Sequence, residues 1–299
     1  MSIKKIYIKL LFPIYILLII FGSDIYSGYA AKKRIQATNT EIKEIRIAII
    51  DTSFDISVFD INNIENPLNV QDNTNALIRL PRFDYSGSLE FSDHGTSIMN
   101  LFIGKYGLLK NAVIIPIQLT SSDNLPRALE YAVNQGANII TISLSFGKSY
   151  NSFPFLSKIA MLEASKNVPI LIAAGNDGVC LEKTIYGQSL ILLAKQSNQR
   201  IWIVGATKLK IIDEHIKLLQ ETITNFSNYP ISIDGKSVFL WAPGQNIVLG
   251  PLWKQIFATG VSGTSIATPM AAIQAIFYSH HRNISIEQAL IELNKIQQK

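Results

Sequence analysis

Residues 45–51 read IRIAIID, a largely apolar run that ends in a carboxylate. Further apolar runs follow it along the chain, each bounded by polar residues or glycine, at 112–117, 139–144, 170–174, 201–204 and 238–241. Short, continuous apolar runs are typical of strands that are buried on both faces of a parallel sheet. The sequence therefore predicts a sheet whose strands lie in the interior of the protein.

Segments with a helical pattern separate these runs. One spans 125–135 and ends before Gly136, and another spans 155–166 and ends shortly before Pro169. Because strand and helix alternate, we predict an α/β fold, doubly wound, with a mostly parallel sheet and helices on both faces. A terminal helix is expected over 286–296, since Ser285 and Gln288 have the spacing of a capping box.

Composition narrows the class of protein. Of the 299 residues, 48% are apolar and only 16% are charged, which favours a folded domain with a large core. The formal net charge of +5 is too small to indicate a nucleic-acid partner. Cys180 is the single cysteine, so an intramolecular disulfide is excluded.

The N-terminus has the pattern of a signal peptide. Basic Lys4 and Lys5 precede an apolar run over 10–22, and the small residues Gly28 and Ala30 follow at the spacing that signal peptidases recognise. We expect cleavage after Ala30 and export to the periplasm or the extracellular space.

The predicted organisation is a signal peptide over 1–30, a short connector over 31–43 and one catalytic domain with its terminal helix over 44–299. An uncleaved membrane anchor is the alternative for the first segment. The uncharged run after Lys9 is shorter than the ~18–20 residues of a spanning helix, which favours the signal peptide.

Polar residues that could carry chemistry stand at strand ends and helix starts. Asp51 follows the first strand, Asn176 follows the strand at 170–174, and His94 and Ser265 each begin a helical segment. Each alone could be a turn or cap residue. Functional groups of open α/β sheets collect at the carboxyl ends of the strands, however, so we expect these four to meet.

Together these residues suit the hydrolysis of an amide bond. Ser265 would attack the carbonyl carbon, and His94 would accept its proton and pass it to the leaving amine. Asp51 would orient the imidazole. The Asn176 side-chain amide and the Ser265 N–H would donate to the oxyanion, helped by the positive end of the helix that Ser265 begins.

These residues lie in motifs that resemble those of the subtilisin-like serine proteases, or subtilases. The matches are IIDT at 49–52, HGT at 94–96, AAGN at 173–176 and GTSIATP at 263–269, with weaker ones at 142–144 and 242–244. The chain order aspartate, histidine, serine is that of the family. The resemblance covers about 43–278.

The resemblance implies a serine endopeptidase that acts on polypeptides through an acyl-enzyme intermediate. In this family the substrate adds as a strand beside the stretch that matches Ile142, Ser143, Leu144 and Ser145. The same stretch and the residues Ala173, Ala174 and Gly175 would line the S1 pocket. No cofactor is implied. We see no acidic cluster that matches a family calcium site, so we predict no metal.

The sequence departs from the family pattern at several positions. Ser53 and Ser145 stand where glycine is usual, and Ser97 stands where a second histidine is common. Ser145 predicts a narrower S1 entrance. The connector is shorter than the propeptide typical of secreted relatives, so either the domain folds unaided or its maturation differs. A catalytically silent subtilase fold that only binds is the alternative, although all four reacting groups are retained.

Overall fold

The computed structural model describes residues 44–78, 80–83, 89–92, 94–104, 107–109, 111–146, 154–208, 210–212, 215–217, 223–248 and 260–298. The predicted signal peptide and connector lie outside these residues. Within the described ranges, no helix has the length and apolar character needed to cross a membrane.

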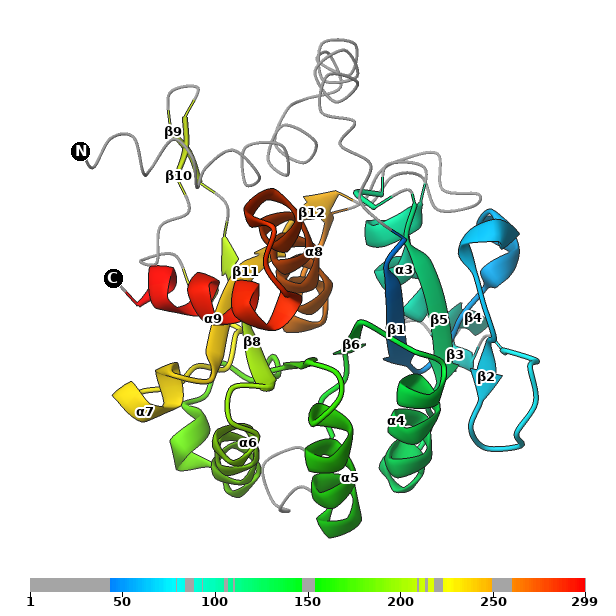
Figure 1. The fold of residues 1–299 in the computed structure, drawn as a ribbon, viewed down its shortest axis with the longest axis horizontal. Coiled ribbons are helices and arrows are strands. Elements are labelled where there is room, and N and C mark those ends of the chain that lie inside the picture. The colour runs from blue at the N-terminus through cyan, green and yellow to red at the C-terminus, as the bar shows by residue number, and fades with distance from the viewer. Residues whose placement is uncertain are drawn as a thin grey trace.

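A parallel sheet forms the centre of the molecule (Figure 1). Counting only described residues it has seven strands, in the order β11-β8-β7-β6-β1-β5-β2, and every neighbouring pair runs parallel. The strands are β1 (Arg46–Asp51), β2 (Leu68–Asn69), β5 (Val113–Gln118), β6 (Ile139–Ile142), β7 (Ile170–Ala173), β8 (Ile201–Lys208) and β11 (Phe239–Gln245).

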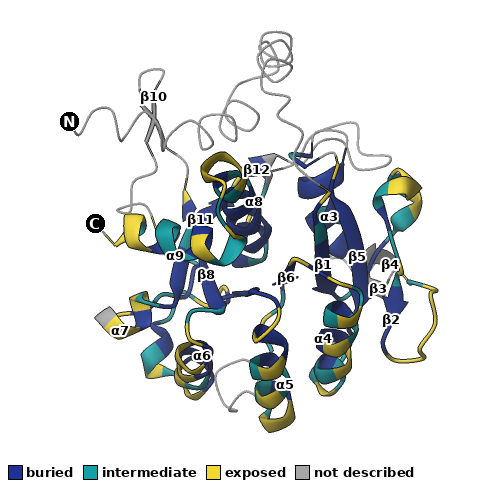
Figure 2. Ribbon diagram, in the orientation of Figure 1, coloured by how far each residue is buried: buried dark blue, intermediate teal, exposed yellow. Residues whose placement is uncertain are grey.

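Helices cover both faces of this sheet. One face packs against α3 (His94–Ile103), α8 (Thr264–Arg282) and α9 (Ile286–Gln297), and the other against α4 (Leu125–Asn134), α5 (Phe155–Ser165) and α6 (Ile185–Gln196). Figure 2 shows buried strands between helices whose outer sides are exposed. The predicted doubly wound α/β fold is confirmed.

Side chains that alternate along each strand point to opposite faces of the sheet. In β1, Ile47 and Ile49 belong to the apolar cluster beneath α3 and α8, whereas Ala48 and Ile50 belong to the cluster above α4, α5 and α6. This follows from the two-residue period of a strand. Asp51 is next in the alternation, so its side chain belongs on the α3 and α8 side.

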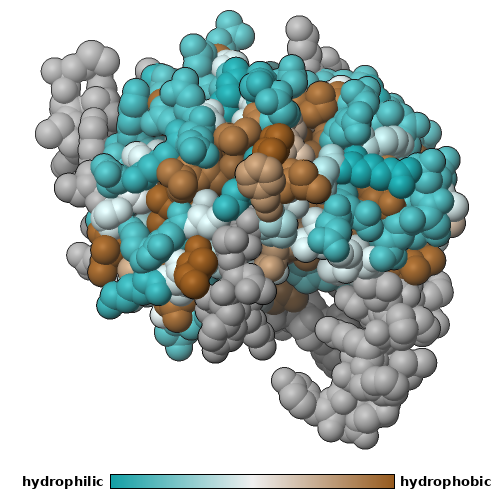
Figure 3. All heavy atoms as spheres, turned by 90° about the horizontal axis from the view of Figure 1, so that it is seen from below, coloured by the Kyte–Doolittle hydropathy of each residue, from teal (hydrophilic) through white to brown (hydrophobic). Residues whose placement is uncertain are grey.

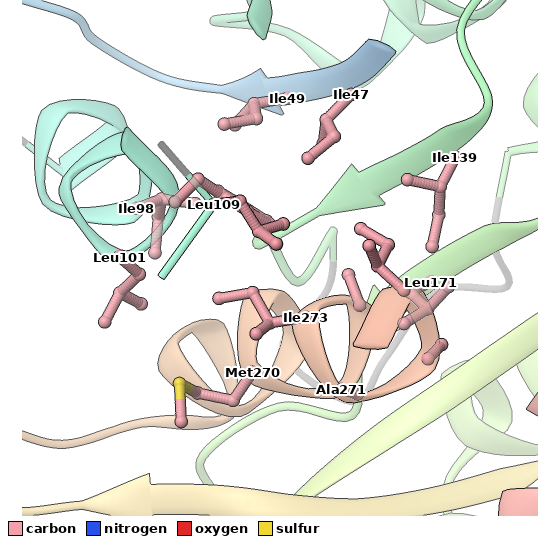
Figure 4. Packing of buried hydrophobic residues seen from close by; sticks show 14 of the residues in the cluster. Ile47, Ile49, Ile98, Leu101, Leu109, Ile139, Leu171, Met270, Ala271 and Ile273 are labelled. Atoms are coloured by element: carbon pink, nitrogen blue, oxygen red, sulfur yellow. The ribbon is translucent and has the colours of Figure 1, made fainter. Parts of the chain in front are cut away.

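The first cluster fixes α8 across the sheet. Figure 4 shows strand residues Ile47 and Leu171 on one side and Ile273 and Met270 of α8 on the other. All of these side chains are fully buried, and burial of each is worth about 1.5–3 kcal/mol. Helix α8 also contacts β6, β7, β8, β11 and α3.

The other described elements are short and peripheral. They comprise three antiparallel pairs, a short helix and four 3₁₀ turns: β3 (Leu80–Phe83) with β4 (Leu89–Ser92), β9 (Lys210–Ile212) with β10 (His215–Lys217), β12 (Ile247–Val248) with β13 (Gly260–Val261), α7 (Ile233–Lys236), and η2 (Ile56–Val58), η3 (Ile61–Asn63), η4 (Ser122–Asn124) and η5 (Leu181–Lys183).

The connections after β1 and β6 leave the sheet in opposite directions. The chain after β1 passes to β2, at the edge beyond β5, and then to α3 on the first face, whereas the chain after β6 passes through α5 on the second face to β7 on the opposite side. Strands β1 and β6 are neighbours in the sheet. Open α/β sheets bind ligands where neighbouring connections diverge in this way. The carboxyl ends of β1 and β6 therefore mark the expected site.

The helices on the second face carry exposed apolar side chains. Figure 3 shows apolar patches surrounded by polar residues on this side of the molecule. They include Phe155, Leu156 and Ile159 of α5 and Ile185 and Leu192 of α6. His94 and Ser265 belong instead to α3 and α8 on the first face.

Candidate active site

Asp51 and His94 form a close pair. Asp51 is the last residue of β1 and is completely buried, and its Oδ1 lies 2.7 Å from His94 Nδ1. The Thr52 N–H donates to the same oxygen at 2.7 Å. His94 begins α3, and its side chain is 35% exposed. The pair therefore joins a buried carboxylate to an imidazole that solvent and substrate can reach.

Close packing of α3 on the loop after β1 brings this pair together. A Cβ at Gly95 would overlap the Ser53 carbonyl oxygen and lie 2.7 Å from the Phe54 ring, so only glycine allows this approach. The Asp55 N–H donates to Thr96 Oγ1 at 2.7 Å, which ties the loop to the first turn of the helix. The residues around His94 thus fix where α3 begins.

Ser265 and Asn176 face a common space beside Gly263. Ser265 is the second residue of α8, and Gly263 precedes the helix with φ 155° and ψ 158°, a conformation open essentially to glycine alone. A Cβ at Gly263 would lie 2.9 Å from Ser265 Oγ and 3.4 Å from Asn176 Nδ2. Glycine therefore leaves room for a substrate atom between the hydroxyl and the amide.

Thr264 orients the Asn176 side chain. The Thr264 N–H and hydroxyl donate to Asn176 Oδ1 at 2.8 and 3.0 Å, and the Thr264 hydroxyl accepts from the Gly175 N–H at 3.1 Å. Because both donors act on Oδ1, this network assigns the oxygen to the α8 side and leaves Nδ2 to face the space beside Gly263.

This space suits a developing negative charge. The Ser265 N–H lies in the first turn of α8, where backbone N–H groups have no intrahelical acceptor. The positive end of the helix dipole lies there as well. An oxygen held beside Gly263 could accept from Asn176 Nδ2 and from this backbone donor.

The stretch predicted to bind substrate begins where β6 ends. Ile142 is the last residue of β6, two residues earlier than the apolar run suggests, and Ser143, Leu144 and Ser145 leave the sheet. Register pairs Ile50 with Ile142, so Ser143 lies beside Asp51. Among the described residues, Ser143 Oγ and Asp51 Oδ2 are buried without a hydrogen-bond partner.

The two predicted walls of the S1 pocket approach each other. Ala173 ends β7, Ala174 and Gly175 follow it, and all three are buried. Ser145 Oγ lies 3.5 Å from the point that a Cβ of Gly175 would occupy. Ser145 therefore stands directly across from the Gly175 wall.

Tyr186 of α6 lies beneath this stretch. Its hydroxyl accepts from the Phe146 N–H at 3.4 Å. Burial raises the pKa of Tyr186 to about 12, with smaller opposing effects of hydrogen bonds from Phe146 and Ser145. Tyr186 is therefore a neutral hydroxyl that helps to hold the chain after β6.

Sequence reasoning gave no role to Asn228, a residue that the structure places at this site. Asn228 bonds to the loop that carries Asn176, as described below. It lies in an irregular segment far along the chain from Asn176, where no motif or periodic pattern points to it.

In the described part of the chain, no group of three or more His, Cys, Asp or Glu side chains is placed to hold a metal ion.

Comparisons with known proteins identify the family of this chain. The family model for the subtilase family, Peptidase_S8, matches residues 43–294. A search of curated proteins found no match.

Solved structures with a similar fold include several proteases. Prenylagaramide maturation protease PagA is 20% identical, with 89% of this chain and 85% of that chain covered and a TM-score of 0.58. Sphericase is 22% identical, with coverage of 84% and 82% and a TM-score of 0.59. A cold-adapted subtilisin-like serine proteinase is 19% identical, with coverage of 83% and 80% and a TM-score of 0.56. At these identities the structures establish a shared fold, and because the family model spans most of the sequence, the chain belongs to the subtilase family of serine peptidases.

Proposed function

We propose that the protein is an active serine endopeptidase that cleaves polypeptides through Ser265, His94 and Asp51. The observation that carries the proposal is the 2.7 Å contact between the buried Asp51 carboxylate and the accessible His94 imidazole. A buried carboxylate on Nδ1 keeps the proton there, so the lone pair is on Nε2, which can act as a base.

In the first half of the reaction, Ser265 Oγ attacks the carbonyl carbon of the scissile bond while His94 takes the hydroxyl proton. The carbonyl oxygen becomes an oxyanion, which accepts hydrogen bonds from Asn176 Nδ2 and the Ser265 N–H. Asp51 stabilises the imidazolium. The carbon–nitrogen bond then breaks, His94 returns the proton to the leaving amine, and Ser265 holds the acyl group.

In the second half, water replaces the amine. His94 removes a proton from the water as it attacks the ester carbon, and the same donors stabilise the second oxyanion. Collapse breaks the ester bond and returns the proton from His94 to Ser265. A carboxylic acid leaves, and the enzyme is restored.

The substrate is an extended peptide that lies along 142–145 as an added strand. The side chain before the scissile bond enters between this stretch and Ala173, Ala174 and Gly175. The names of proteins with a similar fold support a polypeptide substrate, since they include a lanthipeptide protease and the patellamide maturation protease PatA.

Labelling with a fluorophosphonate tests the proposal, because this probe reacts with a serine that an adjacent base activates. We expect the folded protein to be labelled at Ser265 and the Ser265→Ala variant to remain unlabelled. Digestion of a peptide library by the same pair of proteins reports cleavage. A folded wild-type protein that refuses the probe would establish the alternative, a catalytically silent binding protein.

A further inference from the structure

A single side chain from a distant segment holds the loop that carries Asn176. This loop, residues 174–179, follows β7, and Asn228 lies against it. Asn228 is only 4% exposed, whereas Asn176 itself is exposed. The loop therefore has a buried anchor beneath an accessible functional group.

Asn228 bonds to the loop on both sides of Asn176. Before it, Asn228 Nδ2 donates to the Ala174 carbonyl at 2.9 Å, and the Asn228 N–H donates to the Gly175 carbonyl at 3.0 Å. After it, Asn228 Oδ1 accepts from the N–H groups of Asp177 and Val179, each at 3.1 Å. The Asn228 amide also lies 3.4 Å from Asp177 Oδ2.

The loop conformation is fitted to this anchor. Gly175 has φ 101°, in the region that favours glycine, and a Cβ there would overlap Asn228 Nδ2. The preceding residue, Ser227, fixes the anchor to the sheet, because its hydroxyl accepts from the Ala206 N–H of β8 at 2.9 Å. Asn228 thus connects the loop to a buried strand.

This connection bears on catalysis through Asn176. Thr264 sets the rotation of the Asn176 amide, but the position of its Cα depends on the backbone of the loop. A displacement of about 1 Å in a catalytic group can lower the rate by about 10²-fold. A loop without its anchor would misplace the oxyanion donor.

We propose that Asn228 is a positioning residue that fixes the oxyanion donor Asn176, an inference that rests on the proposed peptidase function. Asn228 does not touch the substrate. Its main effect on turnover passes through Asn176.

The test compares Asn228→Ala with a matched control, Thr224→Val. Thr224 is equally buried in the same segment, and its hydroxyl donates to the Ala206 carbonyl at 3.2 Å, away from 174–179. We expect Asn228→Ala to lower kcat by about 10- to 100-fold with KM within about twofold. Thr224→Val should lower the thermal midpoint while kcat stays near wild type.

A double-mutant cycle separates positioning from general destabilisation. In an Asn176→Ala background, Asn228→Ala should change kcat by less than about threefold, because the donor that it positions is already absent. An equal loss in both backgrounds, or an unchanged kcat in folded Asn228→Ala, would overturn the proposal. If Asn228→Ala fails to fold, the isosteric Asn228→Asp replaces it, since it loses the bond to the Ala174 carbonyl and should likewise lower kcat.

Amide hydrogen exchange tests whether Asn228 anchors the loop, independently of catalytic activity. The Asp177 and Val179 amides should be protected in the wild type and exchange faster in Asn228→Ala, but not in Thr224→Val. Rapid exchange of the Asp177 and Val179 amides in the wild type would contradict the proposal that Asn228 anchors the loop. A failure of fluorophosphonate labelling would instead refute the peptidase function, so the two failures are distinguishable.

Discussion

Thr264 links the two halves of the oxyanion site with one side chain. Its hydroxyl donates to Asn176 Oδ1 and accepts from the Gly175 N–H, and its carbonyl accepts from Thr268 Oγ1 at 2.8 Å. A hydroxyl can donate and accept at once, whereas valine, of the same shape, can do neither. The threonine of the GTS motif is therefore explained by its contacts.

At the residue scale, we expect Asn176→Ala to lower kcat by about 10²–10³-fold, the size of the loss known for the side-chain oxyanion donor of subtilisin itself. The amide stabilises charge that develops only in the transition state, so KM should change little. Steady-state kinetics on a peptide substrate provides the measurement. Ser265→Ala serves as the reference and should lose about 10⁶-fold. Unchanged turnover in Asn176→Ala would remove this residue from the mechanism.

The sequence could nominate Asp51, His94, Asn176 and Ser265 as candidate site residues because each stands beside a strand end or helix start in a short motif. It could not identify Asn228. The role of Asn228 consists of bonds to backbone groups of a loop that is remote in sequence, and any buried side chain of similar polarity would look the same along the chain. Tertiary geometry alone reveals such a residue.

At the scale of elements, the approach of two loops predicts cleavage preference. Ser145 Oγ lies 3.5 Å from the Cβ position of Gly175, which narrows the entrance between the stretch after β6 and the stretch after β7. We expect the wild type to prefer small side chains before the scissile bond. Ser145→Gly should raise kcat/KM for large apolar side chains by about 10-fold or more, since one or two methylene groups admitted to a pocket are worth about 1–3 kcal/mol.

A peptide library that varies only this position measures the shift. Ser53→Gly is a suitable control, because it restores the usual glycine at a buried position that belongs to the loop after β1. It should leave the preference unchanged. Equal preference for large side chains in the wild type and in Ser145→Gly would contradict the narrow entrance.

Glu182 lies in the 3₁₀ turn η5, and its carboxylate accepts hydrogen bonds from the segment before α7. Partial burial raises the pKa of Glu182, but hydrogen bonds from the Ser232 and Ile231 N–H groups and the Ser232 hydroxyl outweigh that effect and lower the pKa from 4.5 to about 2. A carboxyl with a lowered pKa stabilises the fold in its ionised state. This contribution is complete above about pH 4.5 and is lost as the pH falls towards about 2.

We therefore expect Glu182→Gln to be less stable than the wild type near neutral pH, with a difference that shrinks between about pH 4.5 and pH 2. Urea unfolding at a series of pH values gives the free energy of unfolding for both proteins. Two curves that run parallel through this range would show that the Glu182 bonds do not contribute in solution.

Element prediction succeeded where the apolar pattern was clean. Every apolar run assigned to a strand lies in the central sheet, and the helices expected at 125–135, 155–166 and 286–296 are present within a residue or two. Helix α6 was not predicted. Its sequence IYGQSLILLAKQ contains a glycine and a continuous apolar run, and it leaves Ile185 and Leu192 exposed, so the helical period is obscured.

At the scale of the whole molecule, the doubly wound architecture could be read from the alternation of strands and helices. The strand order could not, because it depends on which way each connection turns. The chain moves outward from β1 to β2 at the edge, returns to β5, and then crosses β1 to reach β6, β7, β8 and β11. The connections β2–α3–β5 and β5–α4–β6 shift in the same direction along the sheet, yet α3 and α4 lie on opposite faces, so the two crossovers have opposite hands.

We also propose that the protein is exported and cleaved after Ala30, on the basis of the lysines, apolar run and small residues of its N-terminal segment. Expression of the full sequence should yield a secreted chain that begins at Ala31, as determined by mass spectrometry. Ala30→Phe should block cleavage, because signal peptidases require a small residue there. Recovery of the intact wild-type chain in the membrane fraction would support the anchor instead.

The position of α8 in both the sequence and the core has a consequence during protein synthesis. This helix carries Ser265 and packs against four strands and α3, yet among the described elements only α9 follows it. A nascent chain on the ribosome therefore lacks Ser265 and the centre of its first core until α8 has been synthesised. Under the proposed function, a chain that ends before α8 could not cleave a peptide bond, because the attacking hydroxyl belongs to this helix.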